Sequence, residues 1–272
     1  MSKTGIIYGI NGPVVYLKGD SGFKISEMVY VGKENLVGEV IGLKKGMTTV
    51  QVFEETTGLR PGETVTGTGD AISVLLGPGI IHNIFDGIQR PLEEIAKSSG
   101  KYISRGVSVD SLDTQKKWHS HITVKEGDVV GPGTIIAETQ ETASILHKSM
   151  VPPNISGTVL EVAMDGEYTI NEPIVTVQLA NGKEEKLTLA QKWPIRVPRP
   201  TAARFAASKP LITGQRVVDA FFPIAKGGVA AIPGPFGSGK TVTQHQLAKW
   251  AEADIVVYIG CGERGNEMTD VL

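Results

Sequence analysis

Short apolar runs separated by glycine turns dominate the beginning of the chain. Four such runs cover residues 6–8, 14–16, 28–30 and 50–53. Apolar and polar positions that alternate over so few residues are typical of half-buried strands, and closely spaced turns favour a closed sheet. We therefore predict a six-stranded β-barrel for residues 1–70.

The pattern changes twice in the middle of the chain. Residues 71–110 are predicted to form a crossing segment that contains a short helix over residues 91–97. Residues 111–185 return to β-rich runs, which alternate with Gly and Pro turns at roughly ten-residue spacing. This spacing indicates a small barrel or sandwich of strands.

The last part of the chain, residues 186–272, has a different periodicity. The apolar run 228–232 and the longer apolar run 254–260 have the composition of buried parallel strands. Between them, residues 242–252 contain neither Gly nor Pro and are predicted to be helical. The predicted fold class is therefore multidomain, β plus α/β, ending in the first part of a parallel α/β domain.

Composition narrows the class of protein. The chain has 27 Lys and Arg against 29 Asp and Glu, so no basic excess favours nucleic acid as a partner. Cys261 is the only cysteine, which favours a reducing compartment, and we expect an inert thiol at a buried strand end. No apolar run reaches the roughly 18 residues of a membrane span. We expect a cytoplasmic protein that meets a membrane only through partners.

Three histidines are conceivable metal ligands. His119 and His121 lie two residues apart, on one face of a predicted strand, and His147 follows. No Cys or acidic residue is spaced to complete a tetrahedral set around them. We therefore predict no metal site at these histidines.

The strongest chemical signal is the sequence GPFGSGKT at residues 234–241, which matches the phosphate-binding loop of nucleoside triphosphatases. Glycines allow such a backbone to wrap phosphates with its N–H groups, and the following helix adds the positive end of its dipole. We predict that Lys240 bridges the β and γ phosphates and that Thr241 ligates Mg²⁺, with ATP or ADP as the nucleotide. The predicted phosphate-binding residues are Gly234, Pro235, Phe236, Gly237, Ser238, Gly239, Lys240 and Thr241.

A second pair of residues follows the apolar run 254–260. Ligands of open α/β sheets bind at the carboxyl ends of the strands, so Glu263 and Arg264 are predicted beside the loop. A carboxylate there can orient the attacking water, and a guanidinium can hold phosphate oxygens. An acidic–basic pair taken alone is more often solvated surface. Beside a phosphate loop, we assign Lys240, Glu263 and Arg264 as catalytic residues.

These motifs and several upstream blocks resemble the catalytic A subunit of archaeal-type and vacuolar-type rotary ATPases. The blocks are residues 5–15, 55–63, 76–79, 85–92, 210–219 and 262–268, and the likeness covers essentially the whole chain. The resemblance implies ATP hydrolysis or synthesis coupled to movement of H⁺ or Na⁺. It also implies B subunits in an alternating A3B3 hexamer, stalk subunits and a membrane sector as partners. In that family the residues matching Lys240, Thr241, Glu263 and Arg264 serve the phosphates, Mg²⁺ and the attacking water.

Two further features refine the resemblance. Residues 111–185 resemble the bulge insertion of these catalytic subunits, which F-type β subunits are not expected to carry, and we interpret them as an interaction surface. Eukaryotic vacuolar members usually carry a cysteine at the position of Ser238, so serine favours an archaeal or bacterial branch.

The chain ends before some of the family's parts. A second acidic residue for Mg²⁺, expected on a later strand, does not occur before Leu272. The later strands and the C-terminal helical domain of the family are also missing. We expect the N-terminal half of a catalytic A-type subunit, inactive as an isolated chain. The alternative is a non-catalytic binding or assembly module of the same complex.

Overall fold

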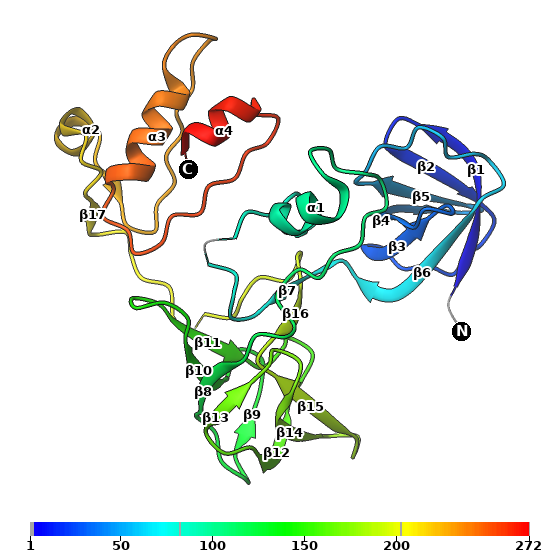
Figure 1. The fold of residues 1–272 in the computed structure, drawn as a ribbon, viewed down its shortest axis with the longest axis horizontal. Coiled ribbons are helices and arrows are strands. Elements are labelled where there is room, and N and C mark those ends of the chain that lie inside the picture. The colour runs from blue at the N-terminus through cyan, green and yellow to red at the C-terminus, as the bar shows by residue number, and fades with distance from the viewer. Residues whose placement is uncertain (1–2, 82, 202, 272) are drawn as a thin grey trace. The chain divides into compact units, whose positions relative to one another are not determined.

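A computed structural model describes residues 3–81, 83–201 and 203–271 (Figure 1). The chain divides into two compact units, residues 1–200 and residues 201–272, and each is described by itself. Within the described ranges, no helix is both long and apolar enough to span a bilayer.

The first six strands close into a barrel in the order β1-β2-β5-β4-β3-β6, with every neighbouring pair antiparallel (Figure 1). This confirms the predicted six-stranded barrel. The strands are β1 (Thr4–Asn11), β2 (Val14–Lys18), β3 (Glu27–Val31), β4 (Leu36–Lys44), β5 (Met47–Val52) and β6 (Thr64–Ala71).

The barrel interior is filled mainly by β-branched and leucine side chains that alternate along the strands. Its fully buried members include Val15, Leu17, Val29, Val31, Leu36, Val40, Val50 and Val65. The carboxylate of Glu27 is also buried, and it accepts hydrogen bonds from the backbone N–H groups of Lys24 at 2.8 Å and Gly69 at 2.9 Å. A buried charge is tolerated only with such partners, so Glu27 holds the segment before β3 against β6.

The crossing segment contains β7 (Ser73–Leu76) and α1 (Leu92–Ser99). The short helix predicted over residues 91–97 is confirmed with a small shift, because Pro91 is the N-cap and Gly100 ends the helix at a φ of 78°. β7 pairs antiparallel with β16 (Gln191–Pro194), so the chain runs to and from the second β-domain along one strand pair.

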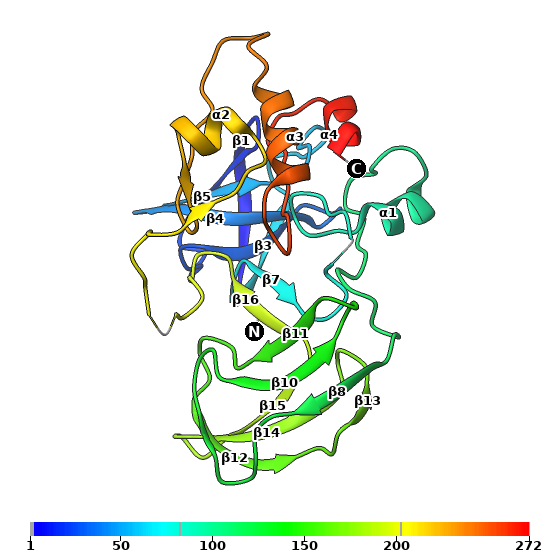
Figure 2. The same ribbon diagram turned by 90° about the vertical axis from the view of Figure 1, so that its left-hand side faces the viewer.

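The second β-domain consists of two four-stranded sheets, β11-β10-β8-β13 and β15-β14-β12-β9, seen as two layers in Figure 2. One core cluster takes side chains from both sheets, among them Trp118, Ile136, Val159, Val177 and Leu187. The strands are β8 (Trp118–Ile122), β9 (Val129–Val130), β10 (Ile135–Gln140), β11 (Leu146–Met150), β12 (Gly157–Val162), β13 (Gly166–Tyr168), β14 (Pro173–Leu179) and β15 (Glu184–Thr188). The predicted β-rich insertion is thus a sandwich.

The second unit contains more helix than strand. Its elements are β17 (Pro210–Leu211), α2 (Arg216–Phe221), β18 (Ile224–Ala225), α3 (Lys240–Trp250) and α4 (Gly265–Val271). The helix predicted over residues 242–252 is confirmed as α3, although it begins two residues earlier.

The prediction of strands over residues 228–232 and 254–260 is wrong, because neither segment forms a strand in this structure. A strand exists only through hydrogen bonds to a neighbour, and no described segment pairs with either run. Their apolar side chains are consequently exposed, with Val229 at 100% and Ile259 at 77%. The burial predicted for Cys261 depended on the second strand, and this cysteine is exposed as well.

An ion-pair network fastens the crossing segment to the barrel. The Arg90 guanidinium contacts Asp86 through Nε at 2.7 Å and Glu54 through Nη1 at 3.1 Å. Nη1 also donates to the carbonyl of Val107 at 3.0 Å, and Glu54 accepts the N–H of Gly106 at 3.0 Å. The side chains of Arg90 and Glu54 are only 11% and 6% exposed, so neither charge has water as an alternative partner.

Replacing Arg90 is therefore expected to destabilise the first unit. Arg90→Ala leaves two carboxylates without their cation, and losing one partner of a buried pair costs about 3 kcal/mol of unfolding free energy. Denaturant titration monitored by tryptophan fluorescence measures the loss. Lys97→Ala is the control, since it removes an exposed pair with Glu94 and should leave the midpoint unchanged. Equal midpoints for Arg90→Ala and the parent would contradict the role of the network.

Candidate nucleotide-binding site

The glycine-rich loop leads directly into α3. Gly237 and Gly239 both have φ of 81°, a left-handed conformation that glycine adopts without a Cβ clash. Gly239 is the N-cap of α3, so Lys240 is the first helical residue. The free N–H groups of the first helical turn therefore follow the loop, which is the local arrangement that binds anions.

The loop is closed on itself by side-chain hydrogen bonds. The Lys240 ammonium donates to the carbonyl oxygens of Gly234 and Pro235. The Ser238 hydroxyl donates to the same Pro235 carbonyl at 2.8 Å. These carbonyls are neutral acceptors, so a phosphate oxygen that reaches Lys240 would offer a stronger, charge-assisted hydrogen bond.

The structure brings Arg264 to the loop through Phe236. The Arg264 guanidinium lies 5.5 Å from the centroid of the Phe236 ring, within cation–π range. Phe236 itself is 89% exposed. Glu263 is exposed just before α4, and no described contact joins its carboxylate to the loop. Loop residues 234–239 are likewise exposed, and Lys240 and Thr241 are half-buried.

Helix α3 is positioned by contacts at both its middle and its end. The His245 ring meets the Tyr258 ring edge-on, with centroids 5.7 Å apart, so His245 is a packing residue. At the C-terminal end, the N–H of Glu252 donates to the carbonyl of Ile212 at 2.8 Å, and the Glu252 carboxylate pairs with Lys226 at 3.0 Å. These contacts hold the helix that carries Lys240 and Thr241.

A residue that sequence reasoning missed anchors the approach to the loop. Asp219 accepts hydrogen bonds from the backbone N–H of Thr213 at 2.9 Å and from its hydroxyl at 2.7 Å. These bonds hold the pKa of the Asp219 carboxyl below its usual value. An acidic residue in the first turn of α2, just after a Thr-Gly turn, is the signal that could have identified it.

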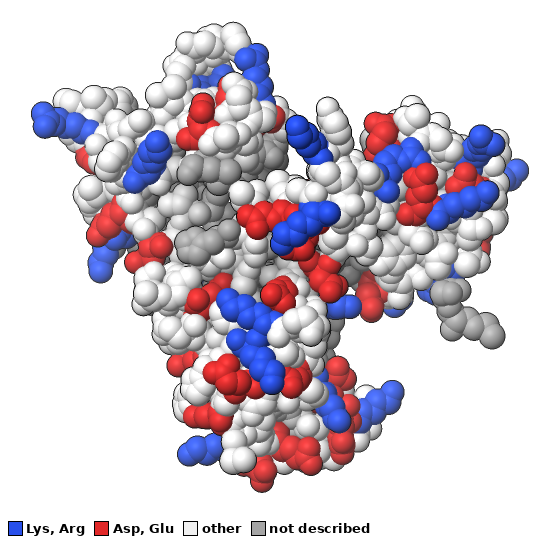
Figure 3. Space-filling model, viewed as in Figure 1, with Lys and Arg blue, Asp and Glu red and all other residues white. Residues whose placement is uncertain are grey.

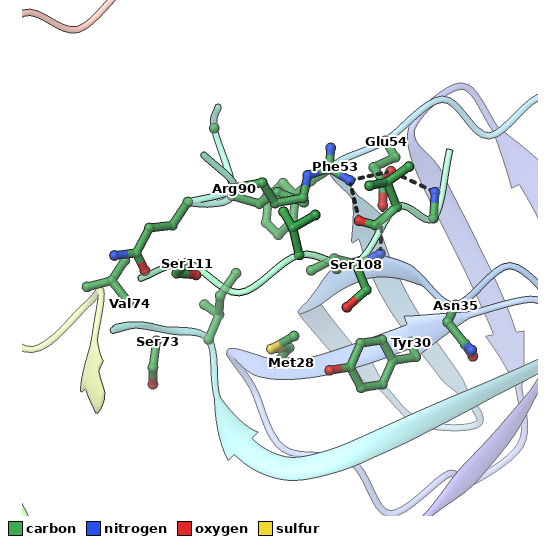
Figure 4. Close-up of a pocket in the computed structure, with 18 of the residues that line it drawn as sticks. Met28, Tyr30, Asn35, Phe53, Glu54, Ser73, Val74, Arg90, Ser108 and Ser111 are labelled. Atoms are coloured by element: carbon green, nitrogen blue, oxygen red, sulfur yellow. Dashed lines mark hydrogen bonds and ion pairs between the residues drawn. The ribbon is translucent and has the colours of Figure 1, made fainter. Parts of the chain in front are cut away.

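A cavity also lies in the first unit, between the barrel and the crossing segment (Figure 4). Its volume is about 690 Å³, and Met28, Tyr30 and Ser108 are among its lining residues. The cation that lines it, Arg90, is already paired with Glu54 and Asp86. A triphosphate needs free donors and cations, so this cavity does not suit one. The loop remains the better candidate.

The face of the molecule shown in Figure 3 has a mixed distribution of charge. Figure 3 shows basic and acidic side chains interspersed over the visible face, with no extended basic stripe. The net charge of −2 agrees with this view.

Three sequence models of one family match the chain. Residues 7–69 match the beta-barrel domain of the ATP synthase alpha/beta family, and residues 109–196 match the ATP synthase alpha/beta subunit barrel-sandwich domain. Residues 214–272 match the nucleotide-binding domain of the same family. The chain belongs to the ATP synthase alpha/beta family.

Curated relatives agree with the family models. The chain is 56% identical over 272 residues to the V-type ATP synthase alpha chain of Halothermothrix orenii. It is 56% identical over 271 residues to the A subunit of the A-type ATP synthase of Methanopyrus kandleri. Each comparison covers 100% of this chain and 46% of the relative, so the chain spans about half the length of these relatives. The resemblance to the A subunits of rotary ATPases is thereby confirmed.

Within the family, the loop and α3 lie in the segment that matches the nucleotide-binding domain. ATP or ADP binding is therefore supported at the level of the domain. The individual roles of Lys240, Thr241, Glu263 and Arg264 stay predictions. The geometry places Lys240 and Arg264 at the loop, whereas Glu263 has no described contact there.

Nucleotide affinity should depend on Lys240. Lys240→Ala removes a charge-assisted phosphate contact, and such contacts contribute about 1.5–3 kcal/mol, so the Kd for ATP should rise roughly 10- to 150-fold. Titration with a fluorescent ATP analogue measures this change. Lys249→Ala, in the last turn of the same helix, is the matched control and should keep the parent affinity. Unchanged affinity in Lys240→Ala would exclude the loop as the phosphate site.

Proposed function

We propose that the chain is part of a catalytic A-type subunit of a rotary ATPase or ATP synthase and binds ATP or ADP at residues 234–241. The carrying observation is the left-handed glycine loop that opens α3 at Lys240, within a match to the family's nucleotide-binding domain. The relatives, named as V-type and A-type ATP synthase subunits, support the wider assignment. The complex would couple nucleotide chemistry to transport of H⁺ or Na⁺.

The proposed binding event is an exchange of partners at Lys240. In the structure, its ammonium is bound by the carbonyls of Gly234 and Pro235. An incoming β or γ phosphate would replace these neutral acceptors with anionic oxygens, which form stronger hydrogen bonds. The remaining loop N–H groups and the start of α3 would complete the phosphate shell.

Thr241 would hold Mg²⁺ beside the phosphates through its hydroxyl. The second residue of a helix that follows a phosphate loop is the position from which a hydroxyl reaches this cation. When bound, Mg²⁺ neutralises part of the charge that develops on the phosphates.

We assign Glu263 to orientation of the attacking water and Arg264 to the γ-phosphate oxygens. Arg264 already lies over the Phe236 ring, so a modest side-chain movement would transfer its guanidinium from the ring to the nucleotide. Glu263 adjoins Arg264 and would approach with it.

The remaining proposals concern assembly. Domains of residues 1–70, 71–110, 111–185 and 186–272 would serve as barrel, crossing segment, bulge and nucleotide domain. B subunits would alternate with the A-type subunits in an A3B3 hexamer, joined by stalk subunits to a membrane sector. The protein would lie on the cytoplasmic side, peripheral to the membrane.

A second candidate function is a non-catalytic binding or assembly module of the same complex. The folded barrel and sandwich favour it, because they present complete surfaces while the apolar runs 228–232 and 254–260 have no partner strand in the described structure. Turnover measured with this chain placed in a full-length relative distinguishes the two functions, because both predict an inactive isolated chain.

Glu263 should matter for turnover more than for binding. The role of Glu263 can be tested in a chimera in which this chain replaces the matched residues of the Methanopyrus kandleri relative. The chimera is assembled with the B subunit of the same organism. Glu263→Gln keeps the side-chain shape but removes the charge that polarises water, so hydrolysis should fall roughly 10²- to 10⁴-fold with ATP affinity retained. Glu267→Gln, on α4, is the control and should keep parent activity. Parent-rate hydrolysis by the Glu263→Gln chimera would rule out the assigned role.

The isolated 272-residue chain is expected to show negligible ATPase activity. Its loop is exposed, and in the described structure the apolar segments that flank the loop have no partner strand. Loose geometry of this kind is costly in catalysis. It also lacks an arginine from a neighbouring subunit, a group that contributes about 10³- to 10⁵-fold to phosphoryl transfer. Steady-state phosphate release is the measurement, with Lys240→Ala as the control for contaminating enzymes. Turnover near 1 s⁻¹ or above, the low end of ordinary enzyme rates, that is lost in Lys240→Ala would contradict this expectation.

A further inference from the structure

The hairpin formed by β10 and β11 contacts the turn at residues 79–81. Glu141 follows β10, and its side chain is only 4% exposed. Its Oε1 accepts hydrogen bonds from the backbone N–H groups of Gly79 at 2.8 Å and Ile81 at 3.0 Å. Glu141 thus ties the sandwich to the turn at residues 79–81, through which the crossing segment continues after β7.

A buried histidine lies beside this carboxylate. His147, on β11, has its Nδ1 at 3.6 Å from Glu141 Oε2, and its side chain is 16% exposed. Its Nε2 is buried and has no hydrogen-bond partner among the described residues. The neutral ring fits this place, but a protonated ring would carry a buried N–H without an acceptor.

The charges that face His147 act in opposite directions. Glu141 attracts a proton to the ring, whereas the Arg199 guanidinium, beyond β16 and stacked 4.3 Å over the Trp193 ring, repels it. Burial is the largest effect, and together with Arg199 it lowers the pKa of His147 below the ordinary value. Among the described residues, these two are the charged groups that influence the ring.

We propose that His147 acts as a proton-operated latch: its protonation opens the contact between Glu141 and the 79–81 turn. This contact lies where the chain continues from β7, which pairs with β16, towards the sandwich. With a neutral ring, Glu141 stays on the two amides of the 79–81 turn. Protonation leaves the buried Nε2–H without an acceptor and in need of water, at a ring that lies beside Oε2 of the carboxylate whose Oε1 binds the two amides. The contact between hairpin and turn then opens locally. This inference does not depend on the proposed nucleotide chemistry.

The direction of the pH dependence follows from linkage. Because the folded protein holds His147 with a lowered pKa, the unfolded or opened state binds more protons in the acidic range. The latch is closed above the ordinary histidine pKa of about 6.5. It loosens progressively as the pH falls through 6.5 towards the lowered value.

Hydrogen exchange of the Gly79 and Ile81 amides tests the proposal in the full chain. After correction for intrinsic exchange rates, their protection should decrease between pH 7.5 and pH 5, by up to roughly 30-fold, the limit that an ordinary histidine pKa of about 6.5 sets at pH 5. His147→Gln keeps a neutral polar side chain and should remove this pH dependence. In parallel, an NMR titration of the His147 ring should show a pKa below 6.5.

His121→Gln is the matched control. His121 is an exposed histidine whose Nδ1 pairs with Asp165 at 2.6 Å, and this pairing raises the pKa of His121. The control should keep the parent's pH-dependent exchange at Gly79 and Ile81. The proposal is overturned if these amides show the same pH dependence in His147→Gln as in the parent, or if His147 titrates at or above its ordinary value.

Discussion

The first unit depends on one constraint: each carboxylate that its irregular segments bury must be matched by donors. The network around Arg90 shows this most clearly, because a single guanidinium contacts Glu54, Asp86 and the carbonyl of Val107. Glu54 belongs to the barrel, whereas Asp86 and Val107 lie in early and late parts of the crossing segment. The crossing segment has little regular structure, so these charge-assisted bonds supply the order that a strand ladder would otherwise provide.

The same solution recurs at other buried carboxylates of this unit. Glu27 binds two backbone amides at one end of the barrel, and Glu141 binds two amides of the 79–81 turn. Glu39, almost fully buried, receives a bidentate contact from Arg196 at 2.9 and 2.8 Å and so ties the barrel to the segment after β16. Buried acidic side chains therefore position the connections, while apolar cores build the barrel and the sandwich. The His147 latch follows from this design, because it places a titratable ring beside one of these carboxylates.

The second unit is not organised around buried carboxylates. Its loop is built mainly by local interactions, namely two left-handed glycines, a helix N-terminus and a lysine that folds back onto the loop carbonyls. Such features depend on residues that lie close together in the chain. The apolar runs on either side need neighbouring strands, and the described structure supplies none. Membership of the ATP synthase alpha/beta family explains the presence of the loop. The proposed catalytic function also requires neighbouring strands that hold the loop in a fixed geometry.

The sequence alone determined the elements whose signals are local. Alternation of apolar residues identified the barrel and the β-rich insertion, and GPFGSGKT identified the loop and the start of α3. It also predicted strands at residues 228–232 and 254–260 and a buried Cys261, and the structure shows neither. These predictions were wrong because strand formation and burial depend on partners distant in the chain. Only the tertiary structure placed Arg90 between Glu54 and Asp86, and His147 beside Glu141. Residues so far apart carry no mutual signal in a single sequence, since their pairing arises from the path of the folded backbone and from the cost of burying an unpaired charge.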